Sequence, residues 1–98
     1  MLYLLFYDIT TDSIRSRVAK LLIDEGFERL QFSVYTAIEN PKNNFVLWDK
    51  LKHLLTPEPT AKLYVIAITK NNFRNIKIIG NFDHDIDYLL GDKRSLTF

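Results

Sequence analysis

Apolar side chains fill positions 2–7 of the chain, and this run ends at a single acid, Asp8. An uninterrupted apolar run of this kind is typical of a central strand that is covered on both faces. A helix is predicted next, because residues 11–13 are good N-cap residues and Gly26 is a good helix stop. The apolar positions between these limits fall on one helical face, at Ile14, Val18, Leu21 and Leu22.

Residues 28–35 alternate between polar and apolar side chains, which predicts a second strand with one face in the core. The core face is expected to carry Leu30, Phe32 and Val34, and the opposite face Arg29, Gln31, Ser33 and Tyr35. Residues 39–44 form a loop by composition. A further short edge strand after Tyr35 would complete a four-stranded sheet.

The second half of the chain predicts one more helix and two more strands. Residues 56–59 end the helix, because neither of their prolines can continue it. Residues 61–69 then predict a strand with two apolar faces, residues 71–72 a turn, and residues 76–79 a short strand before Gly80. The apolar stripe of the helix consists of Leu47, Trp48, Leu51, Leu54 and Leu55.

This order of elements predicts a ferredoxin-like βαββαβ sandwich, an α+β fold with an antiparallel sheet, as a single domain of residues 1–98. Both helices then cover one face of the sheet and leave the other face open. The tail, residues 81–98, adds an extra strand or an extended segment whose apolar side chains have no third helix to cover. We expect this tail to pack on the partner protomer of a homodimer.

Composition narrows the class of protein. Hydrophobic residues make up 47% of the chain, which leaves apolar surface for a partner, and cysteine is absent, which excludes disulfides and thiolate metal sites. The N-terminal apolar run ends too soon for a signal peptide or a membrane span, so we expect a cytoplasmic domain with no membrane partner. The net charge of +1 does not by itself predict nucleic-acid binding.

Asp8 is the first candidate for chemistry. It follows a buried strand and is expected beside a polar strand face that includes Arg29 and Gln31. Mg²⁺ binds through one or two carboxylates while keeping several waters, so Asp8 is a candidate metal ligand and catalytic residue. The alternative is an exposed acid at the end of a strand that caps the following turn.

Basic and amide side chains supply the candidate nucleic-acid contacts. Arg17 and Lys20 share a face of the first predicted helix, and Arg15 points elsewhere on it. Arg29 suits bidentate contact with phosphate, and Gln31 can hydrogen-bond a sugar or a base. The alternatives are a solvated helix surface for the first three and a wet dimer interface for the last two.

Histidine and aromatic residues add little at this stage. His53 lies off the apolar stripe of its helix, and His84 lies between Asp83 and Asp85, which could bind a metal or form a polar turn. A platform for stacking single-stranded bases needs an aromatic residue on an open face. By the alternation of its strand, Tyr35 is the aromatic residue expected there.

Several residues between positions 7 and 35 form a recognisable pattern, namely Tyr7-Asp8-Ile9, Arg15, Arg17, Gly26-Phe27 and Arg29-Leu30-Gln31-Phe32-Ser33-Val34-Tyr35. In these residues the sequence resembles the smaller of the two universal CRISPR adaptation proteins. One departure is visible: members of the family often have an acid directly after the Ser-Val-aromatic segment, and this chain has Thr36.

The resemblance implies a ferredoxin-like homodimer that joins the CRISPR integrase in spacer acquisition. It implies a metal-dependent endonuclease acting on RNA or duplex DNA, with one Mg²⁺ per dimer shared by the two copies of Asp8. Two readings follow, an enzyme that cuts through paired Asp8 residues and a bridge between integrase subunits that catalyses nothing. A third is a related toxin-type ribonuclease that acts without an integrase partner.

Overall fold

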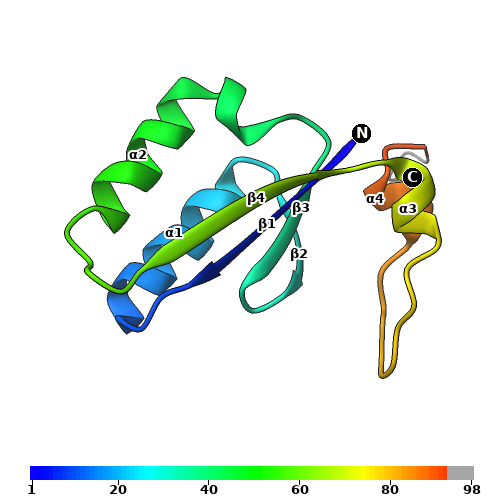
Figure 1. Cartoon of the computed structure of the whole chain (residues 1–98), viewed down its shortest axis with the longest axis horizontal. Coiled ribbons are helices and arrows are strands. Elements are labelled where there is room, and N and C mark those ends of the chain that lie inside the picture. The colour runs from blue at the N-terminus through cyan, green and yellow to red at the C-terminus, as the bar shows by residue number, and fades with distance from the viewer. Residues whose placement is uncertain (93–98) are drawn as a thin grey trace.

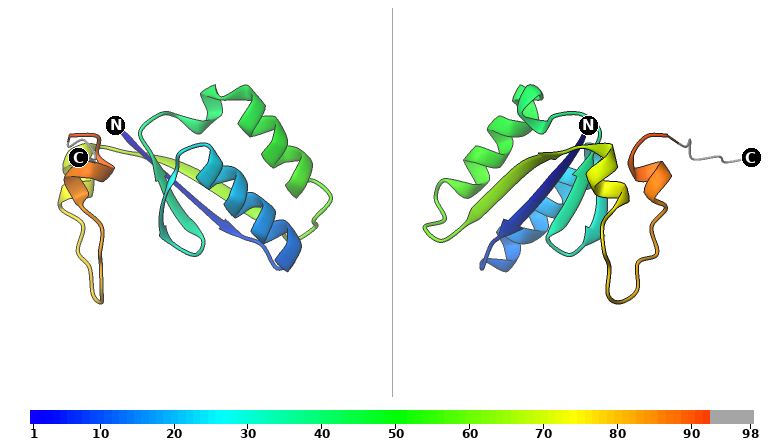
Figure 2. Two further views of the ribbon diagram at one scale, coloured as in Figure 1. Left: turned by 180° about the vertical axis from the view of Figure 1, so that it is seen from behind. Right: turned by 45° about the vertical axis from the view of Figure 1, so that its right-hand side comes forward.

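The computed structural model describes residues 1–92 as a ferredoxin-like α+β sandwich (Figure 1). Its strands form one antiparallel sheet with the order β2-β3-β1-β4. Helices α1 and α2 cover one face of this sheet, as the view from behind shows (Figure 2). The elements are β1 (Leu2–Asp8), α1 (Asp12–Asp24), β2 (Glu28–Gln31), β3 (Val34–Ala37), the 3-10 turn η1 (Pro41–Asn43), α2 (Phe45–Leu55), β4 (Lys62–Ile68), α3 (Lys70–Arg74) and α4 (Ile86–Leu89).

Strand β1 is an interior strand, as its apolar sequence predicts. It pairs along its whole length with β4, from Leu2 opposite Ile68 to Asp8 opposite Lys62, and it pairs with β3 on its other side. Its side chains alternate between the two faces of the sheet. Leu5 and Tyr7 therefore enter the core under the helices, and Asp8 belongs to the other face.

Both long helices begin and end where local signals predict. The backbone N–H of Leu47 donates to the side-chain oxygen of Asn44, 3.1 Å away, which caps α2. Gly26 follows α1 at a φ of +90°, a conformation that a residue with a side chain rarely adopts. The chain then folds back, so that Phe27 packs in the same core as Val18 and Leu22.

The single strand predicted over residues 28–35 is wrong, because a two-residue turn at Phe32 and Ser33 divides it into β2 and β3. Phe32 is 84% exposed instead of buried, and Tyr35 is fully buried instead of open. The turn lacks the glycine or asparagine that usually marks a hairpin. An alternating pattern can run through such a turn without a visible break.

The prediction that Arg29 and Gln31 share a face of the sheet is also wrong, because β2 contains a β-bulge between them. Arg29 pairs with Tyr35, whereas Gln31 pairs with Val34, and the register shifts between the two pairs. Cross-strand partners point to the same face, and neighbouring residues point to opposite faces. Arg29 therefore lies on the helix-covered side with Tyr35, and Gln31 lies on the opposite side.

The segment after β4 differs from its prediction. Residues 71–72 lie in the short helix α3 instead of a turn, with Thr69 as the N-cap, and residues 76–79 pair with no strand of the described chain. Residues 75–85 instead form a loop that projects from the body of the molecule (Figures 1 and 2).

Part of the tail packs on its own chain, and its packing on a partner protomer stays a prediction. Leu89 and Leu90 are buried against Leu2 and Phe73, at one end of the sheet face that the long helices leave open. Salt bridges then link α3 to the segment at α4, from Arg74 to Asp87 and Asp92 and from Lys70 to Asp92. The predictions for residues 93–98 lie outside the described residues.

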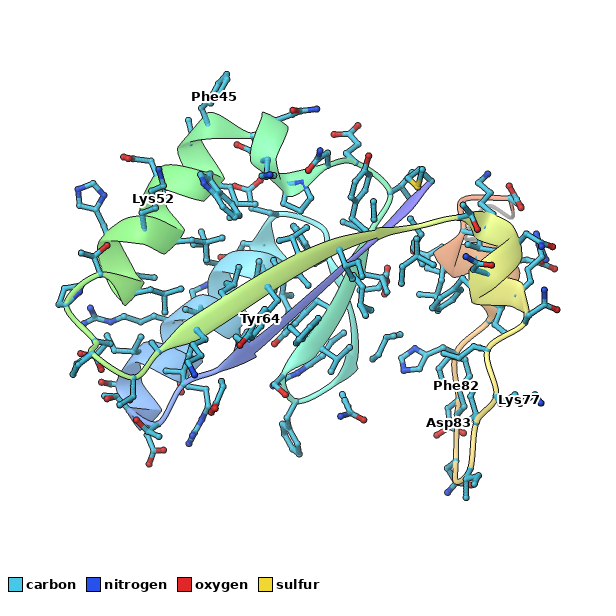
Figure 3. All side chains as sticks on the ribbon, viewed as in Figure 1. Phe45, Lys52, Tyr64, Lys77, Phe82 and Asp83 are labelled. Carbon is cyan, nitrogen blue, oxygen red and sulfur yellow. The ribbon has the colours of Figure 1, made fainter. Side chains whose placement is uncertain are left out.

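No helix of residues 1–92 covers the rest of the open face, which carries exposed apolar side chains. Tyr64 and Ile66 of β4 are 46% and 52% exposed, and the ring of Tyr64 stacks on Phe6 with 4.8 Å between centroids. Figure 3 shows Tyr64 in the middle of this face, beneath no helix. Of the helices in residues 1–92, none is long and apolar enough to span a membrane.

Candidate active site at the end of strand β1

The Asp8 carboxylate is exposed at the last position of β1, where the chain leaves the sheet. The pairing of β1 with β4 extends to Asp8, which lies opposite Lys62, so the backbone of Asp8 has a fixed position. Within the described chain, the Asp8 carboxylate has no hydrogen bond or salt bridge. It therefore does not cap the following turn, and its oxygens are free for a ligand.

Asp8 lies in a shallow cleft that three parts of the chain form together. These parts are the end of β1, the first half of α1 and the turn between β2 and β3. The polar or exposed residues that line the cleft with Asp8 are Arg15, Ser16, Arg29, Phe32 and Ser33. The structure thus brings together two of the four predicted cations.

Arg15 is held at the entrance to α1. Its Nη1 donates to the carbonyl oxygen of Ile9 at 3.1 Å, and its Nη2 forms a salt bridge with Asp12. The side chain is 46% exposed, so part of the guanidinium still reaches solvent beside Asp8. This position suits contact with a phosphate that approaches the cleft.

Arg29 lies on two aromatic rings. Its guanidinium carbon is 5.0 Å from the ring centroid of Phe32 and 5.5 Å from that of Tyr35. Nη2 donates to the carbonyl oxygen of Phe32 at 3.0 Å, and no acceptor in the described residues bonds to the buried Nε. The guanidinium is oriented by these contacts, and it keeps donors that no protein group uses.

Tyr7 supports the turn from beneath. Its hydroxyl donates to the carbonyl oxygen of Phe32 at 3.0 Å and lies 3.3 Å from the hydroxyl of Tyr35. Its backbone N–H donates to the carbonyl oxygen of Ser33 at 3.2 Å. Burial, together with the hydrogen bond to Tyr35, raises the pKa of the Tyr7 phenol well above its usual value. The phenol therefore stays protonated and continues to donate at neutral pH.

Three predicted contacts lie outside the cleft. Lys20 forms a salt bridge of 3.0 Å with Asp24, Arg17 is exposed on α1, and Gln31 is exposed on the opposite side of the sheet from Arg29. Their contact with nucleic acid stays a prediction, and it would require a ligand larger than the cleft.

Comparison with known proteins now identifies the family. The family model of CRISPR associated protein Cas2 matches residues 1–76. The chain belongs to the Cas2 family. The motif residues named above, from Tyr7 to Tyr35, all lie within the matched range.

A curated relative agrees with this assignment. The chain is 45% identical over 47 residues to CRISPR-associated endoribonuclease Cas2 1 of Archaeoglobus fulgidus, a match that spans 48% of this chain and 50% of that protein. The chain thus spans about half the length of this relative.

The solved structures show the fold. The crystal structure of Streptococcus pyogenes Cas2 at pH 6.5 has a TM-score of 0.65, with 24% identity, and the match covers 82% of this chain and all of that one. The crystal structure of a hypothetical protein, TT1823 from Thermus thermophilus, has a TM-score of 0.67, with 24% identity, and covers 85% of this chain and 94% of that one.

Among the described residues that line the cleft of this Cas2-family protein, Asp8 is the one with a carboxylate. Residues 1–92 contain no group of three His, Cys, Asp or Glu side chains that could hold a metal ion, so Asp83, His84 and Asp85 form no such site. Thr36 is buried in β3 and supplies no carboxylate. The exposed Asp8 suits Mg²⁺ as one ligand among waters, and a second Asp8 would make a stronger site.

The sequence analysis did not predict that two residues, Lys62 and Phe32, lie at or beside the site. Lys62 lies directly opposite Asp8 in the pairing of β1 and β4, where its ammonium can add positive charge near a bound phosphate. No local signal could have found it, because strand pairing relates residues far apart in sequence. Phe32 was expected in the core, and the hairpin turn instead places it at the mouth of the cleft.

Proposed function

We propose that this Cas2-family protein is a homodimeric, metal-dependent endonuclease that cuts phosphodiester bonds in RNA or DNA. We further propose that it acts as the nucleic-acid-binding bridge for the CRISPR integrase in spacer acquisition. The observation that carries the proposal is the Asp8 carboxylate, exposed and without a partner in the described chain, between Arg15 and Arg29.

The chemistry of each side chain in the cleft indicates its role in binding the nucleic acid. Arg29 and Arg15 bind and orient the phosphate next to the scissile bond, because each presents a guanidinium with donors directed by contacts to its own chain. Ser33 and Ser16 line the same cleft and can hydrogen-bond the sugar or phosphate. No histidine of the described chain lines the cleft, so neither serine has an imidazole beside it to act as general base, and we assign both serines to hydrogen bonding.

Asp8 is the residue that would hold the metal, one Mg²⁺ per dimer shared by both copies of Asp8. When bound, the ion supplies Lewis acidity and lowers the pKa of a coordinated water. The direction of the Asp8 side chain supports a metal ion shared between the two protomers. Asp8 lies on the same face of β1 as Phe6, and Phe6 stacks with Tyr64 on the open apolar face of the sheet.

The open face is also the surface that we assign to the homodimer. Tyr64 and Ile66 are half-exposed large apolar residues in a continuous row with Phe6. An apolar surface of this kind is stabilised when a second copy covers it. A two-fold axis makes the contacts reciprocal, and a residue that lies near the axis meets its own copy. An axis that passes near the end of β1 would therefore bring the two Asp8 carboxylates to one site.

Cleavage of RNA and DNA by purified wild-type protein and by Asp8→Asn tests the proposal. Asparagine keeps the size of the side chain and removes the charge that binds a cation. We expect wild-type cleavage that stops with chelator and returns with Mg²⁺, and no cleavage by Asp8→Asn at any metal concentration. Wild-type cleavage that survives chelator, or normal cleavage by Asp8→Asn, would contradict the metal mechanism.

A further inference from the structure

Phe32 is a large apolar residue that is exposed to solvent instead of buried in the core. Its side chain is 84% exposed at the tip of the turn between β2 and β3, and it lines the cleft that contains Asp8. Burial of a phenylalanine side chain normally contributes about 1.5–3 kcal/mol, and Phe32 forgoes most of that stabilisation. The ring is therefore available to a ligand that enters the cleft.

The backbone beneath this ring is held in place. The carbonyl oxygen of Phe32 accepts two hydrogen bonds of 3.0 Å, one from the buried hydroxyl of Tyr7 and one from Nη2 of Arg29. The next carbonyl, of Ser33, accepts from the backbone of Tyr7. A ring presented from an anchored turn loses little conformational entropy when a ligand covers it.

The guanidinium of Arg29 contacts one face of the Phe32 ring and is also the group that we expect to bind phosphate. Its guanidinium lies over the ring of Phe32 at 5.0 Å, a cation–π contact. Because 84% of the side chain is still exposed, the rest of the ring is open to a second flat group. A nucleobase is such a group, and its own phosphate would then lie near the guanidinium.

We propose that Phe32 is a nucleobase-stacking residue, which holds one unpaired or flipped-out base beside Asp8. This inference rests on the proposed function, because it assigns a base-binding subsite to the same nuclease cleft. A base within a continuous duplex has both of its faces covered by neighbours and cannot stack on Phe32. The site therefore favours single-stranded or locally opened nucleic acid over intact duplex.

Binding of a short single-stranded RNA to full-length protein tests the inference, with Phe45 as a matched control. Phe45 is 82% exposed at the first position of α2, and Figure 3 shows it at the opposite side of the molecule from the β2–β3 turn. We expect Phe32→Ala to weaken binding about 5- to 150-fold, the range for loss of an aromatic stacking partner. Phe32→Trp should bind at least as well as wild type, Phe32→Leu should lose most of the affinity, and Phe45→Ala should bind as wild type does.

Oligonucleotides with one abasic position at a time distinguish stacking from structural support. If Phe32 stacks on a base, the penalty of Phe32→Ala disappears when that base is missing, because the two changes remove the same contact. If Phe32 only positions Arg29, the penalty is the same on every abasic oligonucleotide, which would overturn the inference. A shift in sedimentation of Phe32→Ala with unchanged RNA affinity would overturn it in favour of a protein interface.

The same experiment distinguishes this inference from the proposed function. Wild-type protein that binds no RNA or DNA at low salt would overturn both. Wild-type protein that binds and cleaves, while Phe32→Ala behaves as Phe45→Ala does, would overturn the stacking role alone. A wild-type preference for single-stranded over duplex substrate that is lost in Phe32→Ala would support both.

Discussion

The hydroxyl of Tyr7 donates a hydrogen bond to the carbonyl oxygen of Phe32, across 25 positions of sequence, at 3.0 Å. A buried residue of the central strand thus anchors the most exposed turn of the candidate site. Asp8 is the next residue after Tyr7, so the carboxylate and the turn share one support. The geometry of the cleft therefore depends on the core and not only on its surface residues.

We predict that Tyr7 makes the protein sensitive to alkaline pH. The folded pKa of the phenol lies above its unfolded value of about 10, so the folded state binds this proton more tightly. The stabilising contribution is complete below about pH 10 and is lost as the pH rises toward the folded pKa. Urea unfolding midpoints at about pH 8 and about pH 11 measure the loss, which cannot exceed about 1.4 kcal/mol per pH unit.

Tyr7→Phe is the matched variant for this measurement. It should be less stable than wild type at neutral pH by about 0.5–1.5 kcal/mol, the usual contribution of one hydrogen bond. It should also lose less stability between the two pH values. Tyr88, whose pKa is raised by its hydrogen bond to Glu28, is present in both proteins and cancels in the comparison. Equal alkaline losses in the two proteins would show that Tyr7 is not the titrating group.

Asp8→Asn should separate the enzyme from the bridge. In the proposed bridge role, contact with the integrase and with duplex DNA would use surfaces other than Asp8, so we expect spacer integration to continue when cleavage stops. Asp83→Asn is a suitable control, because Asp83 is an exposed acid on the projecting loop, far from the cleft in Figure 3. Loss of integration in Asp8→Asn alone would instead make cleavage part of spacer acquisition.

The salt dependence of binding should report the phosphate contacts of Arg15, Arg17, Lys20 and Arg29. Each phosphate contact releases counterions, so removing one lowers the log–log salt slope by about one. The double substitution of Arg17 and Arg29 by Ala should lower the slope by about two. Lys52→Ala should leave the slope unchanged, because Lys52 is exposed on α2 (Figure 3), a helix that contributes no residue to the cleft. An unchanged slope in the double variant would assign Arg17 and Arg29 to an ordinary solvated surface.

Ile66→Asp should convert the proposed homodimer to a monomer. The charge would be buried without a partner if the open face is the dimer interface. Ile23→Asp is the control, since Ile23 is 48% exposed on α1 and Ile66 is 52% exposed on β4. Sedimentation velocity at micromolar concentration should find a dimer for wild type and Ile23→Asp. A dimeric Ile66→Asp would place the interface elsewhere.

A point substitution is preferable here to deletion of residues 81–98. The deletion would remove Leu89 and Leu90 from a cluster with Leu2 of the same chain. It would therefore destabilise the protomer as well as any dimer, and a loss of assembly would have two explanations.

Local signals in the sequence were sufficient for the two long helices α1 and α2, the central strand and the position of Asp8. Asn44 and Gly26 mark helix limits through their own hydrogen bonding and backbone conformation, and an apolar run needs no distant information to predict a buried strand. The family resemblance rested on the same segment, residues 7–35, and the family match over residues 1–76 confirms it.

Only the tertiary structure decided which face each polar side chain occupies. The turn at Phe32 and Ser33 needs no glycine, so the alternating sequence showed no break there. Phe32 was therefore predicted in the core and Tyr35 on the open face, and the structure has the reverse. The bulge after Arg29 and the pairing of Asp8 with Lys62 are properties of strand register. Register is set by contacts between segments that are distant in sequence, and a shift of one residue reverses every side chain. The sequence by itself thus determined which residues are present at the site, and the packing of β1 against its neighbours determined which of them meet.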